Sequence, residues 1–237
     1  MSRISPEQSL AELVTSVPGA ARIFERHGLD YCCGGRQHLD RACRDGGVDL
    51  DEVVEELDGL GAKPPPDWVQ MGPAELVDHL EQTHHAYLHT ELPRLTALAA
   101  KVAAAHGSRH PELADVQHAY EEVRADLEPH LAKEERILFP MIQELATSTT
   151  RPEFHCGTLA NPISVMLGEH DRVGDLLARV RAATDGYRTP SDGCASYRAF
   201  YDGLAELEAD THLHIHKENF VLFPAAERIE GRLAAQR

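Results

Sequence analysis

A His-x-x-x-Glu pattern with lysine directly before the glutamate occurs twice in the sequence, at His130 to Glu134 and at His214 to Glu218. The two copies are 84 residues apart, and each is followed at the same offset by Leu-Phe-Pro. Residues four apart on an α-helix share one face, so each copy places an imidazole beside a carboxylate. A single pair of this kind is more often solvent-facing than metal-binding. Two copies with matching flanks predict a repeated metal-binding unit.

A histidine upstream of each copy extends the repeat. His85 precedes His130 by 45 residues, and His170 precedes His214 by 44. Each upstream histidine is followed seven residues later by a leucine. Two antiparallel helix pairs related by a pseudo-twofold axis would bring these side chains together in the core of a four-helix bundle. The expected ligands of two carboxylate-bridged metal ions are therefore His85, His130, Glu134, His170, His214 and Glu218.

The ligand types restrict which metal is expected. Histidine supplies a neutral nitrogen, and glutamate can bridge two cations while offsetting their charge. First-row transition metals accept such a set, whereas calcium and magnesium prefer oxygen ligands throughout. Structural zinc would favour cysteine ligands. Two iron ions are the best match, with manganese second.

Other histidines crowd the same segments. His84 projects roughly 100° away from His85 on a helix, so only one of them is expected to be a ligand, and the repeat selects His85. His212 and His216 stand two residues either side of His214, and we expect them on the opposite, solvated face. His89, one turn after His85, is left open between supporting the site and facing solvent.

Composition excludes several classes of partner. The chain has 39 acidic against 23 basic residues, a net charge of −16, which argues against binding nucleic acid or an anionic membrane surface. No apolar run approaches the roughly 20 residues that span a bilayer, and no signal peptide is apparent at the start. We expect a soluble, cytoplasmic protein and leave a homodimer open.

Helical spacing dominates the chain, and runs of alternating β-branched and aromatic residues are absent. The fold class is therefore all-α. Residues 1–60 are expected to form a small module of short helices, the last entered at Asp49, and residues 61–70 form a proline-rich linker. A four-helix bundle over 71–232 follows, with long helices at about 73–105, 112–146, 159–184 and 192–229.

The five cysteines do not look like a secreted disulfide framework, because their number is odd and Cys32 and Cys33 are adjacent. Adjacent cysteines rarely bridge, since the small ring is strained. Two interpretations of this pair stay open: thiols that pack in a glycine-rich turn, or a redox or transfer site. Cys43, Cys156 and Cys194 are taken as structural or incidental.

Together these residues resemble the repair-of-iron-centres family, whose members join a short Cys-Cys-Gly-Gly domain to a haemerythrin-like bundle. The likeness covers nearly the whole chain. It includes Asp30-Tyr31-Cys32-Cys33-Gly34-Gly35, the two His-x-x-x-Glu motifs with their Leu-Phe-Pro flanks, and Asn161-Pro162-Ile163 ahead of Glu169-His170-Asp171.

The resemblance implies a non-haem di-iron centre held by four histidines and two bridging glutamates. It also implies a part in the recovery of iron-sulfur enzymes after nitrosative or oxidative damage. The implied partners are damaged iron-sulfur proteins, nitric oxide or oxygen as a small ligand, and an unidentified reductant. Iron donation and reduction of nitric oxide to nitrous oxide are both implied, and enzymatic activity is left open.

The sequence departs from the oxygen-carrying haemerythrins at Gly174. Those proteins use a further histidine one turn after the ligand on the third bundle helix, and here that position is glycine. Fewer protein ligands leave more exchangeable positions, which favours chemistry or metal release over oxygen carriage. The alternatives are a non-catalytic sensor or iron reservoir, and an inert protein with a stabilising metal.

Overall fold

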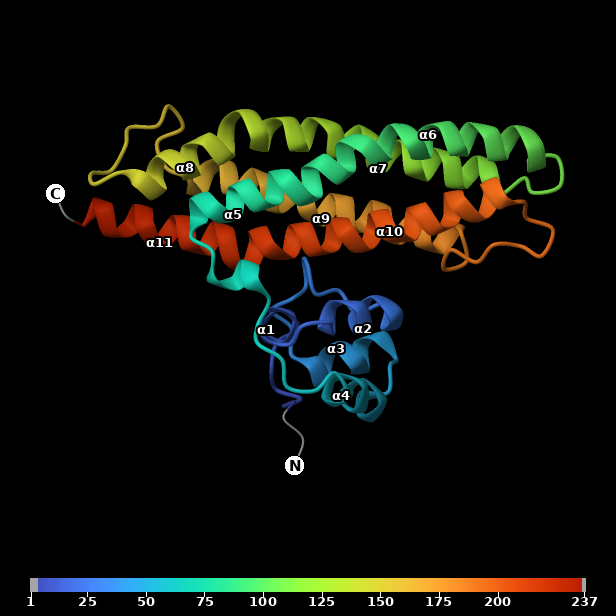
Figure 1. The fold of residues 1–237 in the computed structure, drawn as a ribbon, viewed down its shortest axis with the longest axis horizontal. Coiled ribbons are helices and arrows are strands. Elements are labelled where there is room, and N and C mark those ends of the chain that lie inside the picture. Colours follow the sequence, from blue (N-terminus) through green and yellow to red (C-terminus); the bar gives the residue numbers. More distant parts are fainter. Residues whose placement is uncertain (1–3, 236–237) are drawn as a thin grey trace.

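The computed structural model describes residues 4–235, which form a long helical bundle with a small module attached to its side (Figure 1). Within this range the only β pairing is an isolated bridge between Ser9 and His38. The all-α prediction is confirmed. No helix in the described range is both long and apolar enough to cross a membrane.

The module at the N-terminus consists of four short helices: α1 (Leu10–Ser16), α2 (Ala20–His27), α3 (Leu39–Gly46) and α4 (Leu50–Gly59). Their ends follow local side-chain chemistry. Ser9 and Glu12 form a capping box at α1, and Asp49 caps α4 through the backbone N–H groups of Asp51 and Glu52, as expected. Gly28 ends α2 with φ +64°, a conformation that glycine adopts without strain.

The bundle contains four long helical rods. The rods are α5 (Pro73–Leu80) with α6 (Ala86–His106), α7 (Leu113–Lys133) with α8 (Phe139–Thr147), α9 (Ala160–Ala183), and α10 (Ala195–Lys217) with α11 (Phe223–Ala234). They run alternately in opposite directions (Figure 1). Their bounds agree with the expected helices to within a few residues, except that the last rod continues to Ala234.

Three rods are interrupted by one π-helical turn each, at Glu81–His85, Glu134–Leu138 and Glu218–Leu222. The sequence analysis did not anticipate these turns. Such turns insert a residue into a helix and occur frequently at functional sites. Pro140 and Pro224 follow two of them directly, at the start of α8 and α11, where a residue without a backbone N–H is tolerated. Five of the six expected metal ligands lie in a π turn or at most four residues before one.

The buried side chains form two apolar clusters along the bundle. One continues from the N-terminal module into the bundle half that contains Leu92, Leu131 and Leu177. The other fills the opposite half, around Leu138 and Phe223. The buried polar side chains of the His-x-x-x-Glu motifs lie between these two clusters, so the packing on both sides isolates them from solvent.

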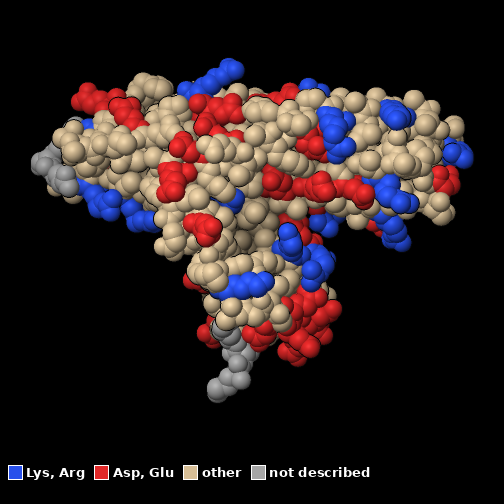
Figure 2. Space-filling model, viewed as in Figure 1, with Lys and Arg blue, Asp and Glu red and all other residues tan. Residues whose placement is uncertain are grey.

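The module contacts the bundle through α2 and the loop between α2 and α3, which points toward α10 (Figure 1). Asn219 donates from Nδ2 to the carbonyl oxygen of Cys32 at 2.9 Å, and Glu25 accepts from His212 Nδ1 at 2.8 Å. On the face seen in Figure 2, acidic side chains gather over the end of the module where α4 lies; Asp51, Glu52 and Glu55 of α4 are exposed.

Candidate metal centre

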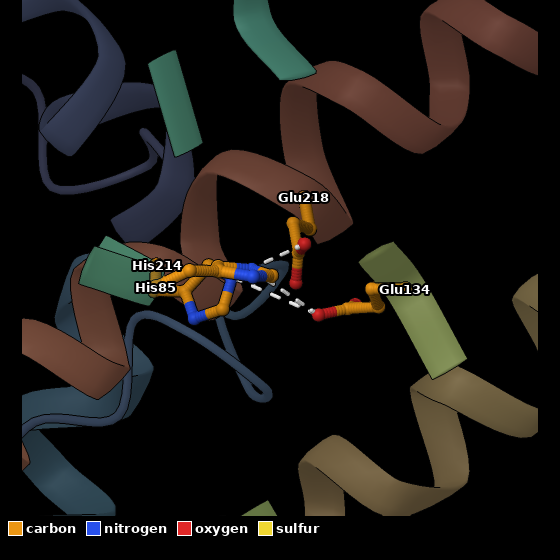
Figure 3. Close-up of side chains that lie close together, drawn as sticks. All are labelled: His85, Glu134, His214 and Glu218. Carbon is orange, nitrogen blue, oxygen red and sulfur yellow. Dashed lines mark hydrogen bonds and ion pairs between the residues drawn. The ribbon is translucent and has the colours of Figure 1, made fainter. Parts of the chain in front are cut away.

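The six predicted ligands converge in the bundle core and are all at most 2 % exposed. Their ligand atoms form two groups, each with all atoms within 4.8 Å of one another. Both groups include the two glutamates, and Figure 3 shows how their carboxylates face the imidazoles of the first group. The first group is His85, Glu134, His214 and Glu218, and the second is His130, Glu134, His170 and Glu218.

The spacing of these atoms suits ligands of one ion. Nε2 of His85 lies 3.3 Å from Nε2 of His214, and Nε2 of His170 lies 3.2 Å from Nε2 of His130. Nε2 of His214 is 3.2 Å from Oε1 of Glu218. Neighbouring ligand atoms at about 2.1 Å from a metal, bound at right angles, are about 3 Å apart. The observed separations are close to this value.

Three of the four imidazoles are oriented by an oxygen on the side away from the cluster. Nδ1 of His85 donates to Glu135 at 2.9 Å, Nδ1 of His130 to Glu169 at 2.9 Å, and Nδ1 of His170 to Oδ1 of Asn219 at 2.8 Å. A carboxylate only accepts, so the proton lies on Nδ1 and the lone pair of Nε2 points inward. This tautomer is the one that binds metals, and such supporting contacts also raise ligand basicity.

The interior of the cluster lacks hydrogen-bond donors for its oxygens. Both carboxylate oxygens of Glu134 and of Glu218 are buried without a hydrogen-bond partner in the described structure. In the second group, the Nε2 atoms of His130 and His170, which both present lone pairs, also face each other at 3.2 Å. Oxygens and lone pairs buried together repel one another unless positive charge lies between them. The donor set therefore fits a cation in each group.

The pKa values of the metal-free cluster also indicate that its carboxylates favour a neighbouring positive charge. Burial lowers the pKa of His130, but Glu134, Glu218 and Glu169 outweigh burial and raise it to about 9. Burial raises the pKa of Glu218, but His214 and His170 outweigh it and hold the pKa well below its ordinary range. Protons on histidines thus balance the carboxylates when no metal is bound.

The Leu-Phe-Pro segments seal one end of the cluster. The ring centroids of Phe139 and His85 are 5.2 Å apart. The ring of Phe223 stacks on that of His170 with 6.1 Å between the centroids. Both phenylalanines are buried. The repeat flanks therefore serve the site as an apolar wall that limits the access of water.

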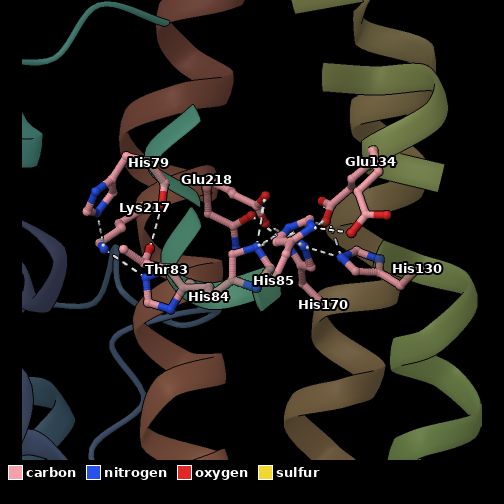
Figure 4. Close-up of polar contacts among 12 residues, drawn as sticks. His79, Thr83, His84, His85, His130, Glu134, His170, Lys217 and Glu218 are labelled. Carbon is pink, nitrogen blue, oxygen red and sulfur yellow. Dashed lines mark hydrogen bonds and ion pairs between the residues drawn. The ribbon is translucent and has the colours of Figure 1, made fainter. Parts of the chain in front are cut away.

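His84 lies beside the cluster and is not part of either group. Its ring stacks on His214 at 5.3 Å with an angle of 7° between the planes, and its Nδ1 donates to Asp210 at 2.8 Å. Lys217 donates to Nε2 of His84 at 2.7 Å and to Nε2 of His79 at 2.9 Å (Figure 4). This buried chain runs from the cluster to the half-exposed side of α5.

The residues that orient the imidazoles follow the same sequence repeat as the ligands. They were not among the site residues predicted from the sequence. Glu135 and Asn219 each follow a motif glutamate, and each contacts the upstream histidine of its own half, His85 or His170. Extending the repeat by one residue would have found both. Glu169 and His84 also occupy equivalent positions.

At these equivalent positions the two halves differ. Glu169 accepts from His130, whereas His84 stacks on His214. The difference shows that the two metal positions have unlike surroundings.

The expectation for His212 and His216 was wrong. His216 is fully buried, with its ring 5.7 Å from that of Tyr31, and His212 is largely covered by Glu25. They do lie away from the metal side of α10, but the N-terminal module covers that face. His89 is 55 % exposed and donates to the same Glu135 oxygen as His85, so it supports the site from its rim.

Cys32 and Cys33 are free thiols at the point where the module meets the bundle. A Cβ atom added to Gly174 would lie 3.5 Å from Sγ of Cys33. The space beside Gly174 is therefore bordered by a thiol of the other module, and not by a neighbouring bundle helix. Cys43 is buried, Cys156 is partly buried and Cys194 is exposed.

Comparison with known families assigns both parts of the chain. Residues 76–226 match the haemerythrin HHE cation-binding domain, and residues 6–60 match a domain of unknown function, DUF542. The relatives of the whole chain include a protein named iron-sulfur cluster repair protein YtfE from Enterobacter sp. (strain 638), 37 % identical over 93 % of this chain and 96 % of that protein. The chain belongs to the repair-of-iron-centres family.

Proteins with the same name from Escherichia coli O1:K1 and Escherichia fergusonii are 36 % identical over the same shares of both chains. The matched haemerythrin domain is described as cation-binding, which agrees with the donor set of the buried cluster. Membership in this family covers the module and the bundle together.

Proposed function

We propose that the protein binds two iron ions in the His-Glu cluster and acts in the repair of iron-sulfur clusters damaged by nitrosative or oxidative stress. One observation carries the proposal: two buried ligand groups share both Glu134 and Glu218. Sharing requires the two ions to be neighbours. The names of the relatives supply the biological context, because they describe iron-sulfur cluster repair.

Each ligand group offers two histidines and the two shared carboxylates, which leaves positions for a small molecule on a six-coordinate ion. Two ferrous ions here would supply two electrons to couple two nitric oxide molecules into nitrous oxide, with two protons taken up and water released. The residues of the chain hold the imidazoles in the metal-binding tautomer and exclude bulk water through Phe139 and Phe223. An external reductant restores the electrons.

Iron donation is the second activity that we include, because coordination positions that the chain leaves open would make the bound ions exchangeable. The cluster lies beside the module that carries Cys32 and Cys33, and Asn219 connects the two. We place the protein in the cytoplasm, where thiols stay reduced, since all five cysteines are free. Damaged iron-sulfur proteins are the proposed partners.

The test begins with metal analysis and an absorption spectrum of the anaerobically purified protein. We expect two irons per chain. With excess reductant and nitric oxide, steady production of nitrous oxide separates an enzyme from a sensor, which would bind the gas once without turnover.

Restoration is measured with an iron-sulfur enzyme inactivated by nitric oxide. Activity should return on addition of the iron-loaded protein and should not return with the His130→Ala, His214→Ala variant. One tightly held iron, or a metal that reacts with no gas, would overturn the proposal.

A further inference from the structure

In the Cys-Cys turn, two thiol sulfurs and a carboxylate oxygen that could bind a metal lie close together. Sγ of Cys32 is 3.6 Å from Sγ of Cys33 and 3.3 Å from Oδ1 of Asp30. All three ligand atoms lie within 4.8 Å of one another. The two sulfurs are too far apart for a disulfide, in which they are about 2.05 Å apart.

The two separations that involve Cys32 are close to those between ligands of one tetrahedral metal ion. Two sulfurs bound at about 2.3 Å to one tetrahedral ion lie about 3.8 Å apart, and a sulfur and a carboxylate oxygen lie about 3.5 Å apart. We propose that Asp30, Cys32 and Cys33 form a separate, labile site for a thiophilic divalent cation such as Fe(II), Zn(II) or Co(II).

The backbone of the turn fixes both thiols on the same side. Asp30 accepts from the backbone N–H groups of Cys32, Cys33 and Gly34 at 3.0, 2.9 and 2.8 Å. The three bonds hold the donor atoms in place before a cation binds. They also draw charge from the carboxylate, so Asp30 is a weak third ligand beside two thiolates.

The site opens into a cavity of about 510 Å³ between the module and the bundle. Carboxylates outnumber positive groups on its wall: Glu25, Asp30, Asp171, Asp175 and Glu208 line it, against Arg181 and the ionisable His212. Such a cavity concentrates cations. Three ligands from the chain would leave a fourth coordination position on a tetrahedral ion for water or an acceptor protein's ligand, and an open position makes the bound ion exchangeable.

Binding of a cation by thiols is coupled to the loss of their protons. On binding, each coordinating thiol gives its proton to buffer and its sulfur forms a bond to the cation. No electrons are transferred, and no oxidant is needed.

The position of the site suggests what it serves. Cys33 borders Gly174, one turn from the di-iron ligand His170, and the Cys32 carbonyl contacts Asn219, which orients that same histidine. The proposed site and the di-iron centre therefore lie on opposite sides of the same contacts, those of Gly174 and Asn219. Its role as a handover point for Fe(II) rests on the proposed function, whereas the binding of a cation does not.

The test uses the full chain with its di-iron centre loaded and reduced, titrated anaerobically with Co(II). We expect one cobalt per chain, an unchanged iron content, and a visible spectrum with the intense bands of tetrahedral cobalt bound to thiolate. The Cys32→Ser, Cys33→Ser variant should bind cobalt at least tenfold more weakly and lose the thiolate bands. The matched control, Cys156→Ser with Cys194→Ser, should behave as the parent.

Iron content and helical circular dichroism show that each variant is folded. Absence of thiolate-bound cobalt in the parent, equal binding by both double variants, or cobalt that enters only by displacing iron would overturn the proposal. No acceptor enzyme is present in the titration. A failure to restore iron-sulfur clusters would therefore not contradict cation binding at the Cys-Cys turn. A failure to bind cobalt would not contradict the di-iron proposal.

Discussion

Cys32 and His170 are connected through a single side chain, although they belong to different modules. Asn219 donates from Nδ2 to the Cys32 carbonyl at 2.9 Å and accepts from His170 Nδ1 at 2.8 Å. The docking of the N-terminal module and the orientation of a metal-facing imidazole thus depend on the same amide. A change in the docking of the module would therefore alter the support of an imidazole in one ligand group.

Replacing Asn219 tests this connection. Asn219→Ala leaves the Nδ1 proton of His170 without its acceptor, and loss of such a contact typically lowers metal affinity about 10–100-fold. We expect one iron to be lost to a chelator faster than in the parent, with the second held more firmly. Asn161→Ala is a matched control, because Asn161 also donates to a cysteine carbonyl, that of Cys156, away from the metal centre. Equal iron retention in both variants would contradict the connection.

The shared carboxylates predict coupled loss of both ions. Glu134→Ala or Glu218→Ala removes an oxygen donor from both groups and negative charge from each, so both irons should be held more weakly together. Glu135→Ala is the control, since Glu135 contacts His85 in only one group. Iron content measured after dialysis distinguishes the cases. Two tightly held irons in the Glu134→Ala, Glu218→Ala variant would refute the bridging assignment.

The metal-free protein should lose stability as pH rises from 6.5 to 8. The pKa of His130 is about 9 in the folded protein, against an ordinary value of 6.5. The folded state therefore keeps a proton that the unfolded chain releases, and this stabilisation is complete below pH 6.5 and declines as pH rises toward 9. The measurement is the thermal unfolding midpoint after treatment with a chelator.

The pH range and the Cys194→Ser background limit the contributions of groups whose stability effect opposes that of His130. Burial lowers the pKa of Lys217 to about 8, and a lowered lysine pKa favours stability as pH rises above that value. A hydrogen bond from the Tyr197 backbone lowers the pKa of Cys194 to about 7, which acts in the same direction, so a Cys194→Ser background is used. The metal-bound protein and a metal-free His130→Gln variant should show a smaller decline, because the raised pKa values of His212 and His110 act in the same direction in all three proteins. A decline of equal size in all three would contradict this origin.

Substitution of Gly174 tests the contact with Cys33. A Cβ atom 3.5 Å from Sγ is in ordinary contact, so Gly174→Ala should fold, with a gain of up to about 1 kcal/mol from helix propensity. The imidazole of Gly174→His needs the space that Cys33 borders, and it offers a nitrogen near one iron. We expect faster alkylation of Cys33, tighter iron binding and slower nitric oxide reduction.

Gly168→His is the matched control for this substitution, since Gly168 lies on the same helix with open space beside it. Its Cys33 should be alkylated at the parent rate. An unchanged rate of nitric oxide reduction and of alkylation in Gly174→His would mean that the position beside Cys33 is not the reactive one.

Local spacing was sufficient to predict the helices, and the repeat selected His85, which the structure places in the buried cluster, over His84. Residues four apart share a helix face because of covalent geometry, so a repeated His-x-x-x-Glu unit indicates its partners even without a structure. Glu135 and Asn219 follow from the same repeat and could have been found in the same way. Within each half, the sequence by itself determined which side chains point in a common direction.

Only the tertiary structure decided what covers each face and how far the two halves differ. His216 points away from the metal side of α10, as helical spacing requires, yet it is buried, because a module more than 150 residues earlier in the chain packs on that face. The π turns and the placement of Cys33 beside Gly174 likewise depend on contacts between distant segments. The periodicity of the sequence indicates the direction in which a side chain points, whereas its burial depends on which distant segment packs on that side.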